Sequence, residues 1–195
     1  MRRLFFALVA ILFSTISFAQ EAHMKFKGIP ICGDVNSMER QLKALGLRDV
    51  GHYDQDLAGH IDFAGYADCT CLVHSTSQSH TVYMITIIFP SSESWTTLRS
   101  QYDTVQKSLL AKYNGKYVSS QEFVSPFKEG DGYEMLALHN HKCDYSTDIT
   151  MDEGNLLLRI GSIKYGSGYV SISYIDHAGY ELKRTEETNQ VLSDL

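Results

Sequence analysis

The architecture follows from TVYMITIIFPSSESWTTLRSQYDTVQKSLLAKYNG, residues 81–115. Residues 81–89 are apolar on both alternating sets of positions, which is typical of a central strand covered on both faces. Pro90 ends that strand, and Ser91 or Ser92 is the expected cap of the helix that follows. Apolar residues then recur at spacings of three and four and predict a long helix closed by Asn114-Gly115; they are Trp95, Leu98, Tyr102, Val105, Leu109 and Tyr113.

Upstream of this stretch, the spacing predicts a shorter helix. Asn36 is the expected cap, with Glu39 three residues later. Met38, Leu42 and Leu45 form an apolar stripe, and Gly46 ends the helix. Residues 60–66 and 67–76 have the composition of strands, and the second of them places two cysteines on one face.

Downstream, residues 116–131 have no clear periodicity and are expected to be irregular, while residues 132–142 fit either a helix or a strand. Residues 143–151 alternate cleanly, and turns at residues 152–155 and 165–168 lead into two more strands. The pattern predicts an α+β fold: two antiparallel β-meanders form one sheet, each half is a pseudo-repeat of a helix plus three strands, and the helices pack on one face.

The amino terminus has the features of a secretory signal peptide. Arg2 and Arg3 precede an apolar run over residues 4–13, and small residues lead to a cleavage site near Ala19. The run is too short for a comfortable membrane span, and no second one follows. We therefore expect a signal peptide at 1–19, a single compact domain at 20–177, a polar tail at 178–195, and a secreted or periplasmic location without a transmembrane segment in the mature chain.

The charge balance bears on the class of partner. The chain has 17 basic and 23 acidic residues, a formal charge of −6. Loss of Arg2 and Arg3 with the leader would leave 15 basic residues against 23, a charge of −8. Since nucleic-acid binding needs a basic face, the balance argues against that partner. The expected partners are another exported or envelope protein or a small ligand, and no cofactor is predicted.

Four cysteines, an even number in an exported chain, favour disulfide bonds. They allow three pairings, and the spacing does not choose among them. The one-residue spacer in Cys69-Thr-Cys71 differs from the C-x-x-C pattern of redox motifs and zinc knuckles. Neighbours on one strand face cannot bond to each other without strain, so each is expected to take a separate partner.

A metal site is an alternative use of the motif HNHKC, residues 139–143. In an extended strand, His139, His141 and Cys143 leave the same face and could serve as zinc ligands. In a helix, His141 would turn away from the other two. Because Cys143 begins an apolar alternating face, a half-cystine is the favoured interpretation, and the metal site is the runner-up.

No catalytic motif stands out. The chain lacks a G-x-S-x-G elbow and an H-E-x-x-H helix, and Asp176-His177 is the one local acid–histidine pair. Tyrosine is abundant, with 12 residues, and partly exposed aromatic residues often contribute to binding surfaces. The candidate binding residues in or beside loops are Tyr117, Phe123, Phe127, Tyr165 and Tyr169.

Several segments resemble a family of uncharacterised secreted proteins of Bacteroidota. The resemblance rests on FKGIPICG at residues 26–33, on the LKALG helix end, and on the FPSSESW entry into the long helix. It implies export and the fold, and it implies cysteines at the positions of Cys69 and Cys143. We hypothesise the pairs Cys69–Cys143 and Cys32–Cys71, which would tie the two meanders together and fix the N-terminal segment.

The sequence favours a non-catalytic protein over an enzyme. The predicted function is an exported binding or interaction module that acts through a sheet face or aromatic-rich loops. Two alternatives stay open: an exported hydrolase whose site residues are dispersed in the sequence, and a metal-binding module that uses residues 139–143.

Overall fold

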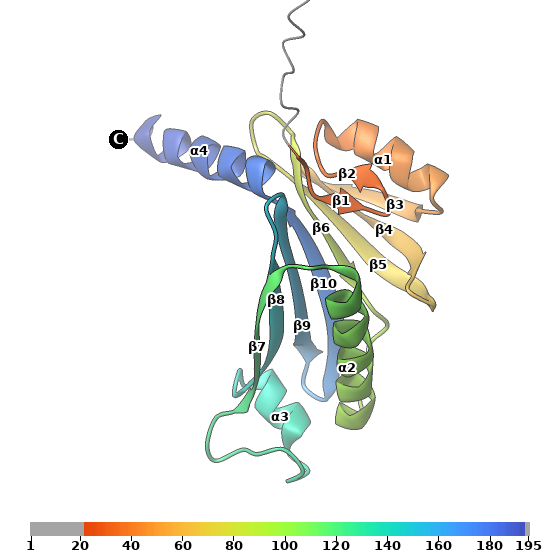
Figure 1. The fold of residues 1–195 in the computed structure, drawn as a ribbon, viewed down its shortest axis with the longest axis vertical. Coiled ribbons are helices and arrows are strands. Elements are labelled where there is room, and N and C mark those ends of the chain that lie inside the picture. Colours follow the sequence, from red (N-terminus) through yellow and green to blue (C-terminus); the bar gives the residue numbers. More distant parts are fainter. Residues whose placement is uncertain (1–21, 194–195) are drawn as a thin grey trace, which may run out of the picture.

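A computed structural model describes residues 22–193; the predicted signal peptide and its cleavage point lie outside the described residues. An eight-stranded antiparallel sheet forms the body, in the order β3-β4-β5-β6-β10-β9-β8-β7, and a two-stranded hairpin, β1-β2, lies beside it (Figure 1). The elements are β1 Lys25–Phe26, β2 Ile29–Pro30, α1 Val35–Ala44, β3 Arg48–Tyr53, β4 Asp56–Phe63, β5 Tyr66–Ser75, β6 Val82–Ile88, α2 Trp95–Lys112, β7 Lys116–Phe123, α3 Glu134–His139, β8 Cys143–Thr150, β9 Gly154–Lys164, β10 Ser167–Asp176 and α4 His177–Ser193.

The long helix α2 confirms the predicted apolar stripe, because Trp95, Leu98, Tyr102, Val105 and Leu109 are all buried. Its cap differs from the prediction. Ser94 caps the helix and accepts a hydrogen bond from the Thr97 N–H. Ser92 instead exchanges backbone hydrogen bonds with Gly168, which holds the chain before α2 against the start of β10.

The short helix α1 is also confirmed, with Met38 and Leu42 buried. Asp34 rather than Asn36 is its cap and accepts from the Ser37 N–H. Leu45 is 40% exposed, and Leu47 takes its place in the core. The helix ends at Ala44, so the chain has already turned away when it reaches Leu45, and the Leu47 N–H bonds back to the Leu42 carbonyl.

Four strands, not the predicted three, follow each of the two helices α1 and α2. The additional strand in the C-terminal half is β7, in a segment predicted to be irregular. β7 pairs along its whole length with β8 at the end of the sheet. Because most of its residues are exposed, its sequence lacks the apolar alternation that marks a half-buried strand.

The two halves of the sheet meet at β6 and β10, which pair through Ile87 and Ile172. β6 is central, as predicted, but only one of its faces is fully buried. Ile85 and Ile87 lie in the core, whereas Met84, Thr86 and Ile88 on the other face are half-buried.

The β1-β2 hairpin completes the core near that junction. Phe26 is fully buried and packs 5.6 Å from the Phe63 ring and 5.2 Å from the Tyr174 ring, measured between centroids. The predicted polar tail forms the helix α4, which projects away from the sheet in Figure 1. Within residues 22–193, no helix has the length and apolar character needed to cross a membrane.

Candidate functional site

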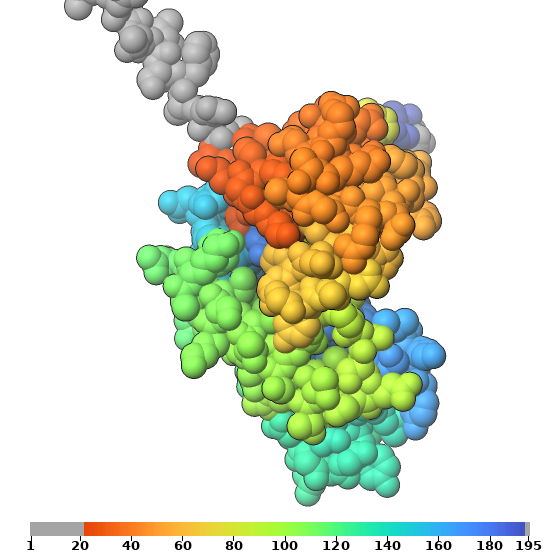
Figure 2. Space-filling model, turned by 90° about the vertical axis from the view of Figure 1, so that its right-hand side faces the viewer, coloured from red at the N-terminus to blue at the C-terminus, as the bar shows by residue number. Residues whose placement is uncertain are grey.

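A cavity of about 610 Å³ opens between the hairpin, the end of α2 and the β8-β9 turn. Figure 2 shows the N-terminal segment, in red-orange, above the green C-terminal part of α2 on this side of the molecule. Basic residues dominate the charged groups of the lining, which include His23, Lys25, Lys27, Lys112 and Glu153. A second hollow of about 520 Å³ shares Lys112, Tyr113 and Glu153 with the first, so the two are continuous around the end of α2.

A buried carboxylate positions the residues at the back of this cavity. Asp176 ends β10 and is 0% exposed. It accepts hydrogen bonds from the Met24 N–H at 2.8 Å and from the Gly179 N–H at 2.9 Å. The second bond, made three residues on at the start of α4, is of the kind made by a helix cap. These bonds supply the partners that a buried carboxylate requires, and they fasten the N-terminal segment to the last residue of the central strand β10.

His23 completes the arrangement. Its Nδ1 lies 3.1 and 3.2 Å from the two carboxylate oxygens of Asp176. Because a carboxylate only accepts, Nδ1 carries the proton and donates it. Nε2 has no hydrogen-bond partner among the described residues, and His23 lines the cavity. A carboxylate that fixes the tautomer of a histidine in this way is an arrangement used both in catalysis and in binding.

Cys32 lines the same cavity and is half-buried. Burial raises the pKa of its thiol, and the negative charge of Asp176 raises the pKa further. Cys32 is therefore a protonated thiol at neutral pH, and thiols in this form are poor nucleophiles. No hydrogen bond joins Cys32 to His23 among the described residues.

The predicted disulfides are not present, since Cys32, Cys69, Cys71 and Cys143 are all free. The sheet order explains the failure of the Cys69–Cys143 pair. Cys69 is on β5 and Cys143 on β8, and the strands β6, β10 and β9 lie between them. Four steps of about 4.8 Å separate such strands, far beyond the reach of a disulfide. Burial raises the pKa of the Cys71 and Cys143 thiols to about 12, which keeps both protonated.

The HNHKC motif does not assemble a metal site. His139 ends α3 and packs edge-on against the Tyr165 ring at 5.8 Å between centroids. His141 is exposed in a left-handed backbone conformation, and Cys143 begins β8. The chain turns between the three residues instead of continuing as one strand. Across the described residues, no three His, Cys, Asp or Glu side chains gather in a way that could hold a metal ion.

The five candidate aromatic residues do not form one surface. Phe123 packs against Trp95 at 5.4 Å between ring centroids and belongs to the core margin. Tyr117 is exposed at the start of β7, whereas Tyr165 is exposed in the turn between β9 and β10. Phe127 lies in the loop before α3, and Tyr169 is half-buried on β10.

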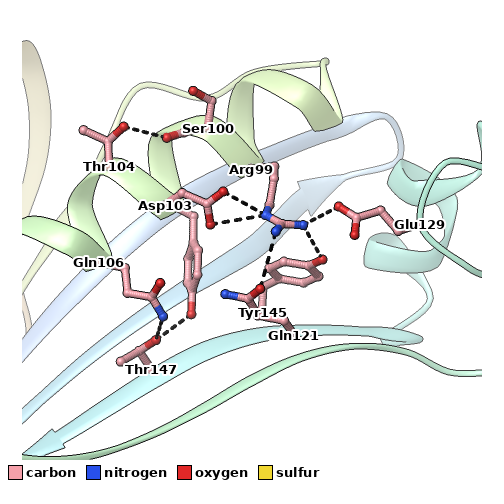
Figure 3. A network of polar contacts seen from close by, with 10 residues as sticks. Arg99, Ser100, Asp103, Thr104, Gln106, Gln121, Glu129, Tyr145 and Thr147 are labelled. Atoms are coloured by element: carbon pink, nitrogen blue, oxygen red, sulfur yellow. Dashed lines mark hydrogen bonds and ion pairs between the residues drawn. The ribbon is translucent and has the colours of Figure 1, made fainter. Parts of the chain in front are cut away.

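A polar cluster on the inner side of α2 joins the helix to the sheet (Figure 3). Arg99 donates to Asp103, Glu129 and the Tyr145 hydroxyl, the last at 2.8 Å. Its guanidinium carbon also lies 5.0 Å from the centre of the Tyr145 ring. Burial raises the pKa of Tyr145 to about 12 despite the opposing positive charge of Arg99.

Thr147 forms the second half of this cluster. Its hydroxyl lies 2.6 Å from Tyr102 Oη, 2.7 Å from Gln106 Nε2 and 2.9 Å from Ser119 Oγ. Every member is paired within the cluster, so the arrangement has the character of a structural bridge between α2, β7 and β8.

Sequence reasoning missed the His23–Asp176 pair. Asp176 was matched with its neighbour His177, but His177 contacts the Asp152 carbonyl and the Asn155 side chain instead. The two residues that pair are 153 positions apart. No local spacing can indicate such a contact; only the return of β10 to the hairpin brings them together.

Comparisons with known proteins give no family assignment. No protein-family model matches the chain, no curated protein matches it, and no solved structure matches its fold. The resemblance to secreted Bacteroidota proteins therefore stays a prediction, and any function must be argued from the residues of the cavity and the sheet.

Proposed function

We propose that this protein is an exported, non-catalytic binding module that holds a small anionic ligand in the cavity beside the hairpin. One observation carries the proposal: an acidic chain places Lys25, Lys27 and Lys112 around the cavity of about 610 Å³, with Glu153 as the carboxylate of the lining. A concave site with convergent groups of one charge attracts ligands of the opposite charge.

The neighbouring groups suit recognition of a carboxylate or phosphate. Lysine Nζ groups act as mobile point charges, and Nε2 of His23, at the back of the cavity, can donate to an anion when both ring nitrogens carry protons. Lys27 already has a fixed position, because its Nζ donates to the Asp62 carbonyl at 3.0 Å. The ligand would thus be held by the flexible side chains of Lys25 and Lys112, by the fixed ammonium group of Lys27 and by one oriented imidazole.

The fold that carries this site is, in our proposal, a pseudo-repeat with its principal helices on one face. Each half has the order helix and four strands, and the sheet order runs inward from β3 and from β7 to the β6-β10 pair. α1 and α2 lie on the same side of the sheet in Figure 1. The cavity forms where the N-terminal hairpin meets the second of these helices.

A second candidate function, a thiol-dependent hydrolase, is favoured by one observation. Cys32, His23 and Asp176 offer a nucleophile, a base and an orienting carboxylate around one cavity. Two features favour binding over this reaction. The pKa of the Cys32 thiol is raised rather than lowered, and no hydrogen bond joins Cys32 to His23 among the described residues. An activated cysteine requires a lowered pKa or a base in hydrogen-bond contact.

Binding of defined anions tests the proposal. Phosphate, sulfate and malonate would be titrated into the mature chain at constant ionic strength, with backbone amide shifts followed by NMR. We expect saturable shifts at Met24, Cys32 and Tyr113, and at least a tenfold weaker affinity in Lys112→Glu. Lys107→Glu, an equal charge change on the same helix outside the cavity lining, is the control.

Two results would reject the anion site. One is an absence of saturable shifts with all three anions. The other is an equal loss of affinity in Lys112→Glu and Lys107→Glu, which would mean that the anions respond only to net charge. Hydrolysis of a thioester or an ester probe that is abolished by Cys32→Ser would favour the hydrolase instead.

A further inference from the structure

We infer that two copies of this chain pair through β7, edge to edge, so that one continuous antiparallel sheet crosses both copies. The inference goes beyond the anion site and does not depend on it. β7 is the last strand of the sheet and pairs with β8 through eight consecutive residues without a shift of register. On its other side, it has no strand partner among the described residues.

The backbone pattern shows which groups β7 presents at that edge. The Val124 N–H donates to the Lys142 carbonyl at 2.8 Å, and Val124 follows β7 directly. Bonding alternates along an antiparallel strand, so the even-numbered residues of β7 bond to β8. The Met151 N–H donates to Gly154, which assigns the odd-numbered residues of β8 to β9 and agrees with this pattern. The outward N–H and C=O groups therefore belong to Tyr117, Ser119, Gln121 and Phe123.

The opposite edge of the sheet is built differently. β3 has a register shift between Arg48 and Gly51, and Asp49 within it has a positive φ of 52°. Such irregularities keep an edge strand from pairing with another chain. β7 has none of these features, although it is the longer of the two strands. A regular exposed edge of this length is suited to strand addition.

The side chains of β7 identify a second copy as the occupant. When two β7 strands run antiparallel about Ser119, Lys116 of each copy faces Glu122 of the other. Both residues lie on the same face of the strand, so the dimer gains two identical cross-strand ion pairs. In this register, Tyr117 faces Gln121, and Phe123 faces Gly115, which leaves room for the aromatic ring. A slide of one strand by two residues, the smallest that keeps the same hydrogen-bonding groups facing each other, would place Glu122 opposite Val118 and lose both ion pairs.

The symmetry makes the assembly closed. A two-fold axis at Ser119 uses the same edge of each copy, so pairing ends at the dimer and leaves β3 as the end strand on both sides. The contact is one strand wide and below the size of a standard protein interface. We therefore expect a weak dimer, with a dissociation constant of roughly micromolar order.

Sedimentation velocity of the mature chain over a range of concentrations tests the dimer. The wild-type chain is expected to shift from monomer to dimer as its concentration rises. Gln121→Pro removes an outward N–H from each copy without touching the bonds to β8, and it should stay monomeric. Gln121→Ala, which keeps the N–H, is the matched control and should dimerise like the wild type. Circular dichroism checks that both variants are folded.

Charge reversal tests the register independently of any proline effect. Glu122→Lys places two lysines opposite each other at both ends of the contact and should weaken the dimer roughly tenfold. The double variant K116E/E122K restores both ion pairs and should recover the wild-type constant. In the dimer, the Ser119 and Gln121 amides should become protected from hydrogen exchange as the concentration rises.

Three results would overturn the inference. The first is a wild-type chain that stays monomeric at millimolar concentration, and the second is a dimer that still forms in Gln121→Pro. The third is a K116E/E122K dimer that is no tighter than the Glu122→Lys dimer. Anion binding is measured on Lys112 and is unaffected by these variants, so failure of the dimer and failure of the anion site are distinguishable.

Discussion

The two halves of the sheet share an order of elements but close their cores by different means. In the N-terminal half, α1 buries only Met38 and Leu42, and the β1-β2 hairpin supplies further apolar side chains. In the C-terminal half, the longer α2 buries five large apolar or aromatic residues, and the short helix α3 adds Ala137 and Leu138. The difference shows that the same order of strands can be covered by a short helix with a hairpin or by a long helix with a short one.

The halves also differ in how polar groups connect helix and sheet. α2 is joined to β7 and β8 by the cluster of Arg99, Tyr145 and Thr147. On the N-terminal side, the corresponding buried polar contact is Asp176, which ties the chain before β1 to the end of β10. The first arrangement fixes a helix on its own half, whereas the second fastens the N-terminal segment to the C-terminal half.

The largest effect on stability is expected in the N-terminal half, where the β1-β2 hairpin supplies part of the core. Phe26→Ala removes a fully buried ring from between Phe63 and Tyr174 and should lower the free energy of unfolding by about 3–5 kcal/mol. Denaturant unfolding measures the change, with the exposed neighbour Lys25→Ala as the control. A loss below about 1 kcal/mol would show that the hairpin is peripheral and that α1 alone closes this half.

A smaller effect is expected from the polar cluster of the C-terminal half. Thr147→Val keeps the shape of the side chain but leaves the buried Tyr102 hydroxyl without its partner at 2.6 Å, which should cost about 1–2 kcal/mol.

Thr86→Val is the matched comparison in the N-terminal half. Thr86 bonds to Ser173 at 2.9 Å on the half-buried face, where water can replace the bond. This variant should change the stability by less than about 0.5 kcal/mol. Equal losses in the two variants would contradict the view that the cluster matters because it is buried.

The smallest effect is a pH dependence in alkaline solution. Cys71 and Cys143, one in each half, have pKa values raised to about 12 from the ordinary value of 9.0, mainly by burial. Since the folded state holds these protons more tightly than the unfolded chain, stability is fully present below pH 9 and declines as the pH rises toward 12. For Cys71, the loss should reach about 1 kcal/mol at pH 10.

Denaturant unfolding between pH 8 and pH 10 measures this slope. Cys71→Ala and Cys143→Ala should each flatten it, and Cys71→Ala should do so more strongly because Cys71 is fully buried in β5. An unchanged slope in Cys71→Ala would show that other groups cause the alkaline loss. A larger flattening of the slope in Cys143→Ala than in Cys71→Ala would mean that folding raises the pKa of Cys143 more than that of Cys71.

Periodicity predicted the elements whose two faces differ in burial. The stripe of α2 and the clean alternation of residues 143–151 both appear as expected. β7 was missed because most of its residues are exposed and leave no pattern. The caps Asp34 and Ser94 each lie two or more residues from the predicted position. For Ser94 the reason is that Ser92 is held by Gly168, a contact that lies outside the local sequence.

The candidate site was harder to predict than the fold. Export, as predicted from the leader, suggested disulfides, and the cysteine count supported them, yet the sheet order separates Cys69 from Cys143 by three strands. The two histidines of HNHKC were set apart by the turn between α3 and β8. His23 and Asp176 carried no local signal, although they form the best-defined polar pair of the cavity.

The sequence by itself determined the fold class, the long helix, the central position of β6 and the acidic balance of the chain, because each depends on composition or on spacing within one segment. Tertiary structure alone decided which strands stand at the edges, which cysteines stay apart, and which lysines gather at the cavity. Those outcomes depend on the order in which strands meet, and that order is set by the pairing of β6 with β10, in which partners such as Ile87 and Ile172 lie 85 positions apart.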